Sequence, residues 1–263
     1  MHKRGQITVF VILGILIIVV LAVIFYLYDL RISPLQQEQP ELDFSRTEVL
    51  KNYVEGCIEE AGDKAINFVG KQGGEIQPGF YQNWNCIEPG RCDHVSYLCY
   101  TTENAACYNK KPFLKSFVEN EINTYVSRQI SSCINLDNLR NQGYNVQAGN
   151  MKLTTQVNDY TTTITLDYPI TLTKGDASVQ QNKFTKTFNK PLGRLIRVAE
   201  DIVRMEVLSP QGYVLYQSYV LSQNGEIQLT HDTYGSTEIY VAGIRNNPYK
   251  FQFAIQNYVT PFP

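Results

Sequence analysis

The chain has 263 residues, of which 43% are hydrophobic and 18% are charged, and its formal net charge at pH 7 is −2. This hydrophobic fraction is large enough to form a folded core. A net charge slightly below zero argues against a nucleic-acid-binding surface, which is normally basic, so we expect no nucleic-acid partner.

The most distinctive segment is the uncharged, apolar run over residues 6–28, which follows Lys3 and Arg4 and precedes Asp29. At ~1.5 Å per residue, a helix of this length crosses a ~30 Å hydrocarbon core. The positive charge before the run predicts a cytoplasmic N-terminus. A cleaved secretory signal is the alternative, but its apolar region is normally shorter. The run therefore predicts a single-pass transmembrane helix in contact with membrane lipid, with residues 29–263 extracellular.

The cysteines predict disulfide bonds rather than a metal site. All six follow the apolar run, and an even number of cysteines outside the cytoplasm is typical of a disulfide framework. Their spacing includes no C-x2-C pair of the kind found in zinc sites. The pairing is left open by the spacing alone. The six residues are Cys57, Cys86, Cys92, Cys99, Cys107 and Cys133.

Proline positions and changes in residue pattern divide the chain into segments. Pro34 and Pro40 interrupt any helix that continues beyond the apolar run. The expected order is a cytoplasmic stub or leader (1–5), a transmembrane helix (6–28), a linker (29–43), a helical cysteine-rich region (44–139), an α+β region (140–208) and an antiparallel β region (209–263).

Two amphipathic helices are predicted in the cysteine-rich region, because apolar residues recur there at three- and four-residue steps. The first begins near a capping box at Ser45 and ends near Gly70, and the second follows Pro112. Cys57 and Cys133 lie on the apolar faces of these helices, so we expect them to form a disulfide bond.

The segment between these helices, residues 75–110, has no clear periodicity and is predicted to be a loop. It contains four cysteines, Cys86, Cys92, Cys99 and Cys107, which most simply pair with one another. Small segments without a periodic apolar face commonly depend on disulfide bonds for their shape.

The pattern changes to strands after residue 139. We predict an antiparallel sheet with one further helix that begins at Pro191, and then a segment that is entirely β. Asn224-Gly225 is a strong hairpin signal within that segment. The expected fold class is α+β. The predicted strands are 144–148, 151–158, 161–173, 183–189, 213–221, 226–230, 237–242 and 249–258.

No catalytic motif is present, so we expect no enzyme, no cofactor and no catalytic or metal-binding residues. His94 follows Cys92 closely enough for a nucleophilic Cys-His pair, but a disulfide bond would consume the thiol. His231 and Asp232 are interpreted as a turn pair.

The N-terminus resembles archaeal type IV pilin-like proteins that have class III signal peptides. The resemblance rests on Lys3, Arg4 and Gly5 followed by Gln6 and the apolar run. It implies that a leader peptide is cleaved between Gly5 and Gln6. Pilins commonly have glutamate at the fifth position after this cleavage, where the present chain has Phe10.

The rest of the chain is similar to archaeal single-pass surface proteins, on residues 54–58 and 70–74. We therefore expect a membrane-anchored extracytoplasmic protein with a structural or binding role at the cell surface. Its expected partners are other envelope proteins or copies of itself. One alternative is a pilin-like filament subunit, and a second is a surface hydrolase or transferase without a recognisable motif.

Overall fold

The computed structural model describes residues 14–24, 47–88, 90–103, 105–208 and 216–257. It divides into two units, residues 1–43 and residues 44–263, which we describe separately. The described part of the first unit is a helix over residues 14–24. Within the residues that the structure describes, no helix is both long enough and apolar enough to cross a membrane.

The predicted transmembrane helix is therefore wrong, and so is the single-pass membrane anchor that depended on it. The prediction required one helix over residues 6–28, whereas the described helix covers residues 14–24. The other residues of the 6–28 run lie outside the described part of the chain.

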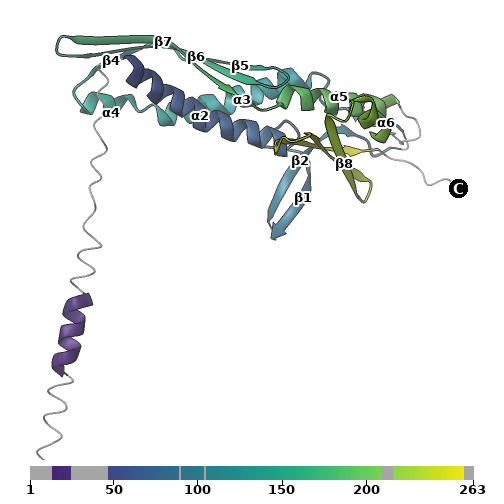
Figure 1. Cartoon of the computed structure of the whole chain (residues 1–263), viewed down its shortest axis with the longest axis horizontal. Helices are drawn as coiled ribbons and strands as arrows, with labels where there is room; N and C mark the ends of the chain where they lie inside the picture. The colour runs from purple at the N-terminus through teal and green to yellow at the C-terminus, as the bar shows by residue number, and fades with distance from the viewer. Residues whose placement is uncertain (1–13, 25–46, 89, 104, 209–215, 258–263) are drawn as a thin grey trace, which may run out of the picture. The chain divides into compact units, whose positions relative to one another are not determined.

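The second unit is an α+β fold that contains two sheets, in which most strand pairs are antiparallel (Figure 1). Its elements, in chain order, are α2 (Thr47–Lys71), β1 (Tyr81–Glu88), β2 (Arg91–Tyr100), β3 (Tyr108–Asn109), α3 (Leu114–Cys133), α4 (Leu136–Asn141), β4 (Asn145–Ala148), β5 (Lys152–Val157), β6 (Thr162–Lys174), β7 (Ala177–Phe188), α5 (Leu192–Leu208), α6 (Tyr216–Ser222), β8 (Ile227–Tyr234), β9 (Thr237–Ile244) and β10 (Lys250–Gln256).

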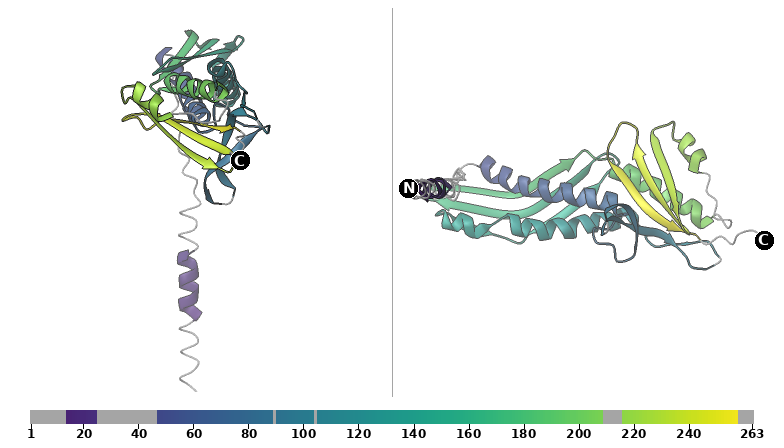
Figure 2. Two further views of the ribbon diagram at one scale, coloured as in Figure 1. Left: turned by 90° about the vertical axis from the view of Figure 1, so that its right-hand side faces the viewer. Right: turned by 90° about the horizontal axis from the view of Figure 1, so that it is seen from below.

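The four-stranded sheet is built on β6, which pairs with β7 along one edge and with β4 and β5 along the other, all antiparallel. Helices α2 and α3 run along this sheet (Figure 2), where α2 contacts β7 and α3 contacts β5. The buried residues of α3 recur at every fourth position, which produces one apolar stripe. They are Leu114, Val118, Ile122, Val126 and Ile130.

The six-stranded sheet has the order β1-β2-β10-β9-β8, and β3 also pairs with β2. Its pairs are antiparallel except β2 with β10, which is parallel and joins the early part of the unit to its last strand. Helix α5 packs on one face of this sheet, against β9 and β10. Helix α2 contacts both β7 and β10, so it connects the two sheets.

Two predicted elements differ from the structure. Residues 75–110 contain β1, β2 and β3 rather than a loop. Strands β1 and β3 pair with β2, which in turn pairs with β10, a strand distant in sequence. The predicted strand at 213–221 is instead the helix α6 over its described residues. Tyr and Val favour strands, but Tyr216, Tyr219 and Val220 pack together against the main core at helical spacing.

Candidate functional site

An irregularity in the central strand of the four-stranded sheet creates the first candidate site. Tyr168 and Pro169 of β6 lie opposite the single residue Asn182 of β7, because the pairing jumps from Asp167 to Ile170. Strand β4 pairs with β6 as far as Ile170, and β5 begins its pairing at Asp167. Ladder pairing is therefore interrupted on both sides of Pro169, which lacks a backbone N–H.

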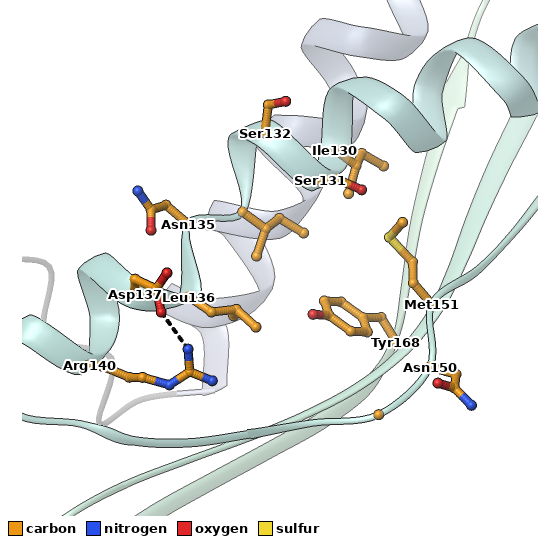
Figure 3. Close-up of a pocket in the computed structure, with 12 residues that line it drawn as sticks. Ile130, Ser131, Ser132, Asn135, Leu136, Asp137, Arg140, Asn150, Met151 and Tyr168 are labelled. Carbon is orange, nitrogen blue, oxygen red and sulfur yellow. Dashed lines mark hydrogen bonds and ion pairs between the residues drawn. The ribbon is translucent and has the colours of Figure 1, made fainter.

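The interruption leaves a cavity of about 580 Å³ between this strand, the end of α3, and α4. We call it the bulge pocket, and Figure 3 shows its lining. Its exposed lining is mostly polar, and the apolar side chains in it are Ile130, Ile134, Leu136, Met151 and the ring of Tyr168. This volume lies within the range that is typical of small-molecule sites.

The charged groups of the bulge pocket come from α4. Arg140 donates from Nη1 to Oδ1 of Asp137 over 2.6 Å, and the two side chains lie side by side at the cavity (Figure 3). Tyr168 is half-buried, and burial raises the pKa of its hydroxyl, while the positive charge of Arg140 lowers it. The two charged groups in the lining are this single ion pair, so the pocket has no net charge.

A second candidate site lies on the face of the six-stranded sheet that is opposite α5. Tyr240 and Ala242 of β9 belong to the main core, whereas Ile239 and Val241 belong to a separate apolar cluster. Because alternate residues of a strand point to opposite faces, Ile239 and Val241 mark the outer face. Trp84 of β1 packs against the same cluster.

Two cavities adjoin each other at this outer face, and the lining of the second also includes Val220, Ile227 and Leu229, which lie in or against the main core. One, of about 410 Å³, lies between α2, the β1–β2 hairpin and β10. The other, of about 850 Å³, lies between α6, β8 and β9. Val241 and Lys250 line both cavities, so together they form one elongated depression, which we call the outer-face groove.

The outer-face groove has an excess of positive charge. Lys71, Lys190, Lys250 and Arg245 line it, against the single lining carboxylate of Asp93. Lys190 is paired with a carboxylate of α2 outside the lining. Among the described residues, no carboxylate lies within 4.0 Å of the terminal nitrogens of Lys71, Lys250 or Arg245.

The floor of the groove is held in place by buried hydrogen bonds. Gln252 is 8% exposed, and its side-chain amide donates to the carbonyl oxygen of Lys71 over 2.6 Å and to Oδ2 of Asp93 over 3.0 Å. Tyr249 donates from its hydroxyl to the carbonyl oxygen of Ile66 over 2.7 Å. The end of α2, the hairpin and β10 are thereby connected around the cationic side chains.

The structure contains three disulfide bonds, which confirms the expected disulfide chemistry. Cys57 is bonded to Cys133 with a Cα–Cα distance of 5.9 Å, as the two helices predicted, although Cys133 is exposed rather than buried. The other two bonds are local, Cys86–Cys92 and Cys99–Cys107.

The disulfide bonds also decide the Cys-His hypothesis. Cys92 has no free thiol, and the ring of His94 is stacked on Tyr81 with centroids 4.1 Å apart. His231 and Asp232 lie within β8 rather than in a turn. Within the described residues there is no group of three or more His, Cys, Asp or Glu that could hold a metal ion.

The predicted leader cleavage at Gly5 and Gln6, and Phe10 after it, lie outside the described residues. No local residue pattern indicates either cavity. Their lining residues come from segments far apart in the chain, and lysines on exposed strands and helix ends are normally solvated.

No protein-family model, curated protein or solved structure matches the chain.

Proposed function

We propose that this chain is a non-enzymatic binding protein and that its outer-face groove binds an acidic polysaccharide. The observation that carries the proposal is the excess of positive charge in an elongated groove of a chain whose net charge is −2. Clefts lined by one sign of charge concentrate ligands of the opposite sign.

The dimensions and surroundings of the groove support an extended ligand. It runs from the end of α2 across β10 and β9 to α6, and its cationic groups are distributed along it rather than gathered at one point. An acidic polymer can contact several of these groups at once, and each exposed pair adds a modest stabilisation. Three disulfide bonds suit an oxidising, extracellular-type environment, where such polysaccharides are available.

The lining also supports binding rather than catalysis. Acid–base chemistry on a glycosidic bond generally uses two carboxyl groups on opposite sides of the bond. The outer-face groove has one lining carboxylate, Asp93, and its Oδ2 accepts a hydrogen bond from the buried Gln252. Envelope proteins or further copies of the chain remain predicted partners.

Affinity electrophoresis of the full chain in gels that contain polygalacturonate tests the proposal. We expect retardation that weakens as salt is added, and no retardation by neutral dextran. The variant Lys71→Gln/Arg245→Gln/Lys250→Gln should bind about tenfold more weakly, because three exposed ionic contacts are lost.

The matched control is Lys110→Gln/Lys152→Gln/Lys183→Gln, which removes the same charge from exposed positions outside the groove. The control should be retarded like the unmodified chain. Equal retardation of both triple variants, or stronger retention by a DNA duplex than by polygalacturonate, would refute the proposal.

A further inference from the structure

We propose that the bulge pocket is a second, independent binding site, which accepts an uncharged pyranose sugar. The pocket lies against the four-stranded sheet and shares no lining residue with the outer-face groove. Its ligand is therefore inferred from its own chemistry, and the inference does not depend on the groove.

The charge of the pocket selects against an ionic ligand. Arg140 and Asp137 are the charged residues in its lining, and they neutralise each other over 2.6 Å. A ligand with a net charge would have to compete with this ion pair for one partner and would leave the other partner unpaired. A neutral ligand can hydrogen-bond to both groups without breaking the pair.

The polar groups match neighbouring sugar hydroxyls. A carboxylate only accepts hydrogen bonds and a guanidinium only donates them. A pair of adjacent hydroxyl groups can therefore donate to Asp137 and accept from Arg140 at the same time. Within the described structure, the hydroxyl of Tyr168 has no hydrogen-bond partner, so it is free to donate to or accept from a third ligand hydroxyl.

The apolar part of the lining matches the C–H face of a pyranose ring. Leu136, Met151 and Tyr168 lie around the open space opposite the end of α3 (Figure 3). An apolar ligand would leave the hydroxyl of the half-buried Tyr168 without a hydrogen-bond partner when that group loses water. That loss disfavours a purely apolar ligand.

Saturation-transfer NMR of the full chain with methyl glycosides of glucose, galactose, mannose and N-acetylglucosamine tests this site. At least one glycoside should bind with a millimolar dissociation constant. Arg140→Ala should weaken that binding about tenfold, and Tyr168→Phe should weaken it about threefold, which are losses of the size expected for ligand hydrogen bonds.

The matched controls are Arg128→Ala on the exposed surface of α3 and Tyr234→Phe at the exposed end of β8, which do not line the pocket. Both should bind like the unmodified chain. The groove variant Lys71→Gln/Arg245→Gln/Lys250→Gln should also retain glycoside binding, so the two proposals fail separately. The site is refuted if no glycoside binds, or if N-acetyl-leucine amide binds in preference to every glycoside. It is also refuted if Arg140→Ala leaves the glycoside affinity unchanged, provided that the thermal midpoint of this variant shows that it is folded.

Discussion

At the scale of single residues, the most unusual group is the buried carboxyl of Glu206, which is 1% exposed. Oε1 of Glu206 and Oε2 of Glu238 lie 2.9 Å and 2.7 Å from the hydroxyl of Tyr240. That hydroxyl has one hydrogen, so both contacts can be hydrogen bonds only if one carboxyl is protonated. Burial raises the pKa of Glu206, so we expect Glu206 to be the group that holds the extra proton.

This arrangement predicts how stability depends on pH. Because the folded-state pKa of Glu206 is raised above its ordinary value of 4.5, the folded state binds more protons than the unfolded state above that pH. The contribution of Glu206 is therefore fully present below pH 4.5 and is lost as the pH rises through the folded-state pKa.

Glu206→Gln should remove this dependence, because a glutamine amide reproduces the protonated acid and can donate to Tyr240. Urea unfolding at pH 4 and pH 8 measures the effect. We expect similar free energies of unfolding for the two proteins at pH 4 and a more stable variant at pH 8. A variant that loses stability equally at both pH values would show that Glu206 is ionised in the folded protein.

At the scale of elements, α2 and α3 protect the open edges of the four-stranded sheet. Glu119 of α3 accepts a hydrogen bond from the backbone N–H of Val157 on β5 over 2.8 Å. Glu55 of α2 accepts one from the backbone N–H of Thr185 on β7 over 3.3 Å. Unpaired backbone groups at sheet edges otherwise invite pairing with another chain.

The two edge contacts should differ in strength. Val157 is fully buried, so Glu119→Ala leaves its N–H unsatisfied and should lower the free energy of unfolding by about 1–2 kcal/mol. Glu119→Gln keeps an acceptor oxygen and should cost less. Glu55→Ala should cost under about 0.5 kcal/mol, because Thr185 is exposed and water can replace the carboxylate. Urea unfolding gives all three values, and equal losses for Glu119→Ala and Glu55→Ala would contradict this explanation.

The disulfide bonds predict a second difference between elements. Cys57 and Cys133 are separated by 76 residues in sequence, whereas Cys86 and Cys92 are separated by 6. In the chain-entropy model, their removal by paired alanine substitutions should cost about 4 and about 2 kcal/mol, respectively. Unfolding by urea under oxidising conditions measures both. A larger loss for the short loop would show that entropy of the unfolded chain is not the main effect.

At the scale of the whole second unit, α2 couples the two sheets through close contacts at two glycines. A Cβ atom at Gly62 would lie 2.5 Å from the ring of Phe188, next to the four-stranded sheet. A Cβ atom at Gly70 would lie 2.6 Å from the hydroxyl of Tyr249, next to the six-stranded sheet. One helix thus depends on close packing against both sheets, and we expect the unit to unfold in a single transition.

Gly62→Ala and Gly70→Ala test this coupling. Each should lower the free energy of unfolding by about 1–3 kcal/mol, because the added methyl group overpacks its site. Hydrogen exchange should then accelerate in the slowest amides of both sheets for either variant. Gly56→Ala is the control, since no atom lies within 4 Å of its Cβ position, and it should stabilise α2 by about 0.5–1 kcal/mol. Acceleration confined to the nearer sheet would show that the sheets unfold separately.

The sequence by itself determined the elements whose signal is local. The apolar stripes of α2, α3 and α5, the alternating strands β4 to β6, and the turn at Asn224-Gly225 follow from residue spacing and turn chemistry. The Cys57–Cys133 bond was predictable for the same reason, because both cysteines were placed on apolar helix faces. The apolar composition of residues 6–28 predicted a transmembrane helix, but no helix among the described residues is long and apolar enough to cross a membrane.

Only the tertiary structure decided the features that depend on pairing between distant segments. Strand β1 is mostly exposed and pairs with β2, whose buried residues 95–99 lie beside the distant strand β10, and α6 packs as a helix despite strand-forming residues. The bulge pocket arises where β4, β5 and β7 all interrupt their pairing with β6. The outer-face groove brings Lys71 beside Lys250, residues that no local pattern connects. Sequence periodicity reports which face of an element is apolar, whereas a binding site depends on which elements that face meets.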